Sequence, residues 1–197
     1  MLENLKTINA YDNSLIILTA DHGAELNWEK HSKYSLYDER IRVPLIVKYP
    51  NWFDGSKSKN EFVNTNTEIH KIIYRSLELP LPKHLIDLNE YKLNESIIYS
   101  ETIYNPNQDP RSHSIALMND NYKLVNFNRI NLKSFEYEKT MDSLFFKWND
   151  QNKAFDENNN LISEPKYDKI IKDLNRTSNK LIVNNLKQLK NNPTQLY

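Results

Sequence analysis

Two short apolar runs lie in the first quarter of the chain, with a long polar stretch between them. The first run is Leu15–Leu18 and the second is Val43–Val47. Short runs of leucine and β-branched residues between chain breakers are typical of strands that are buried on both faces. Because a long connection leaves room for a crossover, we expect strands at 14–19 and 43–48 to pair in parallel, or to lie close together in one sheet.

Three other segments have the apolar spacing of amphipathic helices. They lie within residues 1–11, over 67–79, and from about 166 to 189. The last of these helices is expected to pack through four apolar residues, which are Ile170, Leu174, Leu181 and Leu186.

The second half of the chain has the pattern of antiparallel strands joined by turns. Strands are expected at 96–104 and 142–148, and the segment 114–127 is expected to form a hairpin. Its turn would lie at Asn119–Asn121, because asparagine and aspartate favour tight turns. These strands predict a small antiparallel sheet.

Composition excludes several classes of function. The chain has no cysteine, so disulfides, thiolate metal sites and a cysteine nucleophile are excluded. Its 26 basic and 26 acidic residues balance, which argues against nucleic acid as a partner. No apolar run approaches the roughly 18 residues of a membrane span, and the first residues lack the apolar centre of a signal peptide. The compartment stays open.

Asp21, His22 and Gly23 follow the first apolar run directly. In open α/β sheets, ligands bind beyond the carboxyl ends of the strands. A carboxylate beside an imidazole at such a position suggests half of a metal centre. Gly23 would free the backbone for the turn that points both side chains the same way.

The residues around this pair resemble a known family. The sequence DNSLIILTADHG, then His31 and Lys33, then SLYDERIRVPLIVKYP is similar to the second metal-binding segment of the sulfatase family, within the alkaline-phosphatase-like superfamily. The later sequence LFFKWNDQNKAFDENNNLI is similar to the ending of that family. Four of its residues are in register with the family pattern: Leu144, Glu157, Asn160 and Leu161.

The resemblance implies an α/β fold in two parts. Residues 1–82 would be part of an alkaline-phosphatase-like α/β/α core, and residues 83–197 would form a small C-terminal subdomain with an antiparallel sheet and a helix. The full family enzyme hydrolyses a sulfate ester with a formylglycine nucleophile and a divalent metal. The nucleophile and the other metal ligands would belong to a missing N-terminal half.

The resemblance also implies roles for individual residues. Asp21 and His22 would bind the metal, and Lys33 would contact the ester oxygens, with Lys30 as the competing assignment. His31 could donate a proton to the leaving group or be a polar loop residue. We expect Asp21, His22 and Lys33 to converge on one open concavity.

Several alternatives stay open at this point. The metal would be calcium, or manganese or zinc because His22 supplies an imidazole. The parent could instead be a phosphoester or phosphonate hydrolase or a phospho-group transferase, so the substrate is a sulfate or phosphate ester. The chain could also be a non-catalytic remnant or a partner subunit. By itself it is expected to be inactive.

Other polar residues are expected to be structural. The segment Tyr37–Arg42 would support the loop that carries Lys33. His70 would lie on a helix, and His84 and His113 would lie in loops with no partner at ligand spacing.

Overall fold

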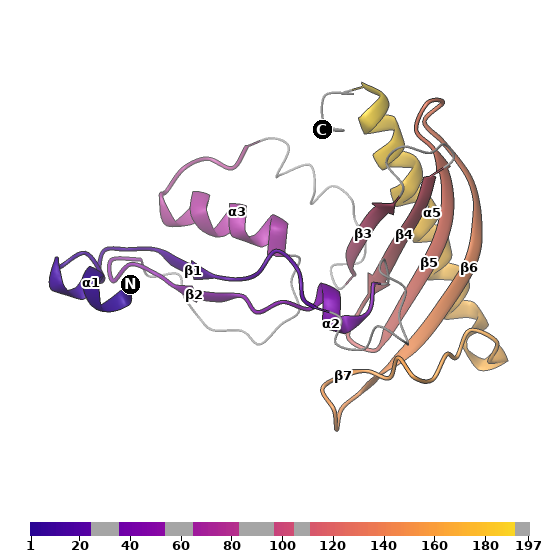
Figure 1. Cartoon of the computed structure of the whole chain (residues 1–197), viewed down its shortest axis with the longest axis horizontal. Helices are drawn as coiled ribbons and strands as arrows, with labels where there is room; N and C mark the ends of the chain where they lie inside the picture. Colours follow the sequence, from indigo (N-terminus) through magenta and orange to yellow (C-terminus); the bar gives the residue numbers. More distant parts are fainter. Residues whose placement is uncertain (25–35, 54–64, 83–96, 105–110, 192–197) are drawn as a thin grey trace. The chain divides into compact units, whose positions relative to one another are not determined.

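The structure is a computed structural model (Figure 1), and it describes residues 1–24, 36–53, 65–82, 97–104 and 111–191. The chain forms two compact units. The first unit is Met1–Gly23 with Arg42–Lys92, and the second is Ala24–Ile41 with Leu93–Tyr197. The segment that ends at Ile41 therefore groups with the C-terminal part of the chain, which the sequence-based division at residue 82 did not anticipate.

The first unit contains the expected strands as a two-stranded sheet. β1 (Ile16–Leu18) pairs with β2 (Ile46–Lys48), so the prediction that both segments share a sheet is confirmed. The prediction of parallel pairing is wrong, because Ile16 lies opposite Lys48 and Leu18 opposite Ile46 in an antiparallel register. In an antiparallel pair the first strand ends beside the start of the second, so the pairing of β1 with β2 needs no crossover connection.

Burial of the β1–β2 pair also differs from the expectation. Leu18 and Ile46 are cross-strand partners on one face, and each is 59% exposed. The strands are therefore not buried on both faces within the described part of the chain, although their composition is that of buried strands.

The first unit also contains two helices, and a lysine side chain holds the turn before β1. The helices are α1 (Leu2–Thr7) and α3 (Thr65–Ser76). At the end of β2, Lys48 Nζ donates to the carbonyl oxygens of Tyr11 at 2.5 Å and of Asp12 and Ser14 at 3.1 Å each. Lys48 thus fixes the turn that leads into β1.

The second unit is built on a five-stranded antiparallel sheet in sequential order. Its strands are β3 (Ile98–Tyr104), β4 (Arg111–Met118), β5 (Tyr122–Asn131), β6 (Glu136–Asn149) and β7 (Ala154–Phe155). The predicted hairpin at 114–127 is confirmed as the β4–β5 pair.

Asparagine side chains form the turns of this sheet. Asn119 Oδ1 accepts from the backbone N–H groups of Asn121 at 3.0 Å and Tyr122 at 2.8 Å. Asn131 accepts in the same way from Lys133 and Ser134 between β5 and β6. Asparagine favours turns because its side chain can accept hydrogen bonds from the backbone N–H groups two and three residues later.

The predicted terminal helix is confirmed as α5 (Asp168–Asn191), which follows a short 3₁₀ turn at Pro165–Tyr167 and packs on β4, β5 and β6 (Figure 1). Leu174, Leu181 and Leu186 are buried as expected, but Ile171 is the buried residue of the first turns, and Ile170 is half-buried. No helix of the described chain is both long and apolar enough to cross a membrane.

Opposite faces of the β-sheet bury against different elements. On β5, the Asn126 side chain reaches α5, whereas Val125 packs with Leu36 on the other side. Leu36 precedes the single-turn helix α2 (Asp38–Ile41) and is 4% exposed in a cluster with Ala116, Met118, Val125, Phe146 and Phe155. The segment Leu36–Ile41 is therefore a third layer of the second unit.

Candidate functional site

Asp21 and His22 lie beyond the end of β1, and their side chains approach each other. Asp21 Oδ1 accepts from the His22 backbone N–H at 2.8 Å, and His22 Nε2 lies 3.8 Å from Asp21 Oδ2. The side chains are 88% and 66% exposed, respectively. The turn after β1 thus breaks the alternation of a strand, which would direct adjacent side chains to opposite faces.

The imidazole of His22 is oriented by a backbone carbonyl. His22 Nδ1 lies 2.7 Å from the Gly23 carbonyl oxygen, which can only accept, so Nδ1 carries the proton. Nε2 then has a free lone pair on the side of Asp21. A histidine that binds a metal commonly donates its other ring N–H to a carbonyl in this way. Because two ligands bonded to one zinc-sized ion lie no more than about 4 Å apart, the 3.8 Å separation is compatible with shared ligation.

The other candidate site residues lie in the loop after Asp21 and His22. Lys30, His31 and Lys33 lie outside the described residues, so their convergence with Asp21 and His22 stays a prediction. Within the described ranges, no group of three or more histidine, aspartate or glutamate side chains could hold a metal ion. Asp21 and His22 stay candidates for two of the ligands of a metal.

A buried ionic cluster lies in the second unit, and the sequence reasoning missed it. Lys123 on β5 is fully buried, and its Nζ lies 2.9 Å from Asp38 Oδ1 and 2.6 Å from Glu157 Oε1. The Asp38 backbone N–H donates to both Glu157 oxygens at 3.0 and 3.1 Å. The Phe155 backbone N–H donates to Asp38 Oδ2 at 3.2 Å. These bonds join α2, β5 and the end of β7.

Burial raises the pKa of the Glu157 carboxyl above its usual value of 4.5, because the charged form loses hydration. The nearby Lys123 acts in the opposite direction, and the second carboxylate, Asp38, adds to the rise. A raised carboxyl pKa can mark an acid–base group. Here the cluster is closed to substrate, because Lys123 is fully buried and both carboxylates are 14% exposed.

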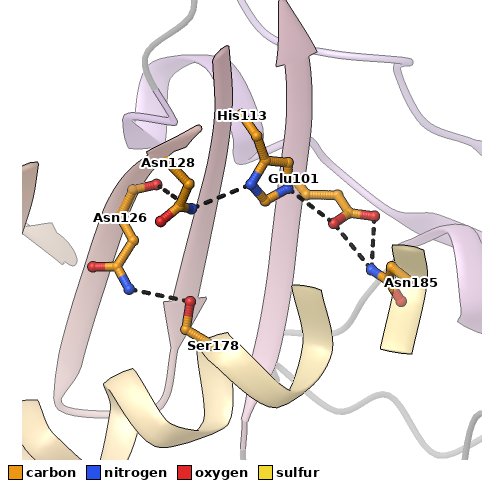
Figure 2. Close-up of polar contacts among 6 residues, drawn as sticks. All are labelled: Glu101, His113, Asn126, Asn128, Ser178 and Asn185. Carbon is orange, nitrogen blue, oxygen red and sulfur yellow. Dashed lines mark hydrogen bonds and ion pairs between the residues drawn. The ribbon is translucent and has the colours of Figure 1, made fainter. Parts of the chain in front are cut away.

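His113 also lies in a polar network, and not in a loop as the sequence suggested. It is on β4 and is 3% exposed. Figure 2 shows its ring between Asn128 and Glu101. Asn128 Nδ2 donates to Nδ1 at 3.2 Å, and Nε2 donates to Glu101 Oε2 at 3.3 Å. Asn185 of α5 donates to both oxygens of Glu101 at 3.0 Å.

The same network continues across the sheet towards α5 (Figure 2). Asn126 Nδ2 donates to Asn175 Oδ1 at 2.8 Å and to Ser178 Oγ at 3.1 Å, and Asn126 Oδ1 accepts from Ser143 Oγ at 2.7 Å. Buried polar groups need such partners, because an unpaired one costs about 1–3 kcal/mol. The network holds α5 on the sheet. The only sequence signal for it would have been that alternate side chains of β4 and β5 point to the same face of the sheet.

The residues in register with the family ending have structural roles. Asn160 Oδ1 accepts from the Phe145 backbone N–H at 3.0 Å, and the Leu161 backbone N–H donates to the Phe145 carbonyl at 2.8 Å. Glu157 belongs to the Lys123 cluster. These hydrogen bonds hold the segment after β7 against β6.

Comparison with known proteins gives matches to sulfatases. Residues 1–74 match the family model described as Sulfatase. An ulvan-active sulfatase of Formosa agariphila is 26% identical over 194 residues, which cover 91% of this chain and 35% of the relative. An N-acetylglucosamine-6-O-sulfatase of Bacteroides thetaiotaomicron is 26% identical over 139 residues, which cover 64% of this chain and 25% of the relative.

A solved structure, in complex with its substrate D-glucosamine-2-N,6-O-disulfate, resembles this chain with a TM-score of 0.64 and 20% identity. The likeness covers 97% of this chain and 37% of that one, and it supports the predicted fold class, in which an alkaline-phosphatase-like α/β portion precedes an antiparallel sheet and a helix. This chain thus spans about a third or less of the length of these relatives. The family-model match and the two curated relatives agree that this chain is similar to sulfatases.

Proposed function

We propose that this chain is the C-terminal portion of a metal-dependent sulfuric ester hydrolase. In this proposal, Asp21 and His22 are two of the metal ligands. Lys33 contacts the ester oxygens, and His31 donates a proton to the leaving group. The nucleophile and the remaining ligands come from a sulfatase segment outside residues 1–197, because the chain has no cysteine to convert to formylglycine.

The observation that carries this proposal is the arrangement of Asp21 and His22. Both side chains are exposed, they approach to 3.8 Å, and the Gly23 carbonyl leaves His22 Nε2 free to bind an ion. A bound divalent cation would withdraw charge from the ester oxygens. Imidazole favours manganese or zinc over calcium at this position.

Burial in the first unit supports the view that other polypeptide completes the site. Among its described residues, no apolar side chain other than Pro50 is buried, whereas the second unit has an extensive buried core. The paired Leu18 and Ile46 remain 59% exposed in a two-stranded sheet, and isolated pairs of strands are marginal in water. A sulfatase segment beside β1 and β2 would cover these residues.

The names of the relatives suggest the class of substrate. The two curated relatives are named for ulvan and for N-acetylglucosamine sulfate, and the solved structure holds a glucosamine disulfate. We therefore infer that the complete enzyme acts on the sulfate ester of a saccharide.

Metal titration tests the proposal that Asp21 and His22 form only half of a site. We expect calorimetry of the purified chain with Mn²⁺ or Zn²⁺ to give weak or undetectable binding, because a stable site needs at least three protein ligands. His70→Ala serves as the control, since His70 is exposed on α3. Tight stoichiometric binding that His22→Ala abolishes and His70→Ala preserves would contradict the half-site.

A further inference from the structure

We propose that Asp38, Lys123 and Glu157 are positioning residues, which hold the segment Leu36–Ile41 in one position on the sheet of the second unit. Asp38 and Glu157 are 119 positions apart, and Lys123 on β5 lies between their carboxylates. The segment leads directly into Arg42, where the first unit resumes.

Apolar contacts alone would hold this segment less specifically. Leu36 is buried against Val125 and Phe146, and the rings of Tyr37 and Phe146 lie 6.0 Å apart. Such contacts are non-directional, so a small slide of the segment would cost little. The charged cluster is directional, because each of its hydrogen bonds requires a particular donor opposite a particular acceptor.

The hydrogen bonds of Asp38 restrict its side chain and backbone to one position. Oδ1 accepts from Lys123 Nζ, Oδ2 accepts from the Phe155 backbone N–H, and the Asp38 backbone N–H donates to Glu157. Any shift of the segment would break bonds to two separate parts of the chain, β5 and the segment Phe155–Glu157. A buried ion pair often adds little net stability compared with apolar residues of the same size, so specificity of position is the role that this cluster fits.

Asp38→Asn tests this role with the smallest change of shape. An asparagine amide has one acceptor oxygen and one NH₂ group. Whichever way it turns, its NH₂ group faces a donor, either Lys123 Nζ or the Phe155 N–H. The matched control is Glu39→Gln, which removes the same charge one position later from an exposed side chain.

The readout is hydrogen–deuterium exchange of backbone amides in the full chain. The Arg40 and Ile41 amides donate to the Tyr37 carbonyl at 2.9 and 3.1 Å, within the segment that the cluster is proposed to hold. We expect both to exchange about tenfold faster in Asp38→Asn, while the Leu124 and Val125 amides stay within about twofold of the wild type. In Glu39→Gln, all four should stay within about twofold.

Two results would overturn the positioning role. Unchanged exchange of Arg40 and Ile41 in Asp38→Asn would mean that the apolar contacts suffice. An equal acceleration of the Leu124 and Val125 amides would mean that the cluster supports the whole unit. The variant Lys123→Met/Asp38→Leu/Glu157→Met gives a second test: we expect it to fold with β5 amides protected and with Arg40 and Ile41 exchanging about tenfold faster. Wild-type rates at Arg40 and Ile41 in that variant would also reject the role.

Discussion

Replacing Lys123 with methionine is expected to lower the free energy of unfolding by about 3–5 kcal/mol. The substitution keeps most of the length of the side chain but removes the only ammonium group that contacts both Asp38 and Glu157 in the described cluster. Two carboxylates, each 14% exposed, would then face each other without a cation. Urea unfolding followed by circular dichroism measures the change.

Lys147→Met is the control for this prediction. Lys147 is exposed on β6, so its replacement should change the free energy of unfolding by less than about 0.5 kcal/mol. A loss below about 1 kcal/mol in Lys123→Met would contradict the buried cluster and would place the Lys123 amine in water.

Phe145→Ala is expected to cost about 3–5 kcal/mol of stability, because it opens a cavity in the core. Phe145 on β6 has 0% exposure, and its ring centroid lies 5.4 Å from those of both Tyr122 and Tyr167. The substitution removes the aromatic contacts that pack Tyr122 of β5 and Tyr167 of the 3₁₀ turn before α5 against β6. The same urea titration measures it.

Met141→Ala provides a matched control on the same strand. Met141 is 55% exposed, so the loss of its side chain should change stability by less than about 0.5 kcal/mol. Similar losses in both variants would mean that Phe145 is not the core residue that its burial indicates.

Local sequence signals predicted most of the second unit. The turn at Asn119–Asn121 and the apolar spacing of 166–189 depend on residues close together in the chain, so β4, β5 and α5 could be predicted. The two-residue strand β7 could not, because Ala154–Phe155 is too short to show a period.

Long-range pairing could not be predicted from the same signals. The direction of β2 relative to β1 depends on the path of the intervening chain, which belongs to the second unit. The partners of His113 and Lys123 depend on strand register and on contacts between distant segments. Asp21 and His22 could be identified as candidates because the Asp-His-Gly motif follows a strand directly. The placement of Lys33 stays a prediction.

Hydrolysis by the purified chain is the most direct test of the central claim, that it carries part of a sulfatase site without the nucleophile. The assay uses an aryl sulfate and a bis-aryl phosphate, each with Ca²⁺, Mn²⁺ and Zn²⁺, and includes Asp21→Ala. We expect the wild-type chain and the variant to give the same background rate with both substrates. Turnover of either ester clearly above background, abolished by Asp21→Ala, would contradict the claim and reveal a complete active site within residues 1–197.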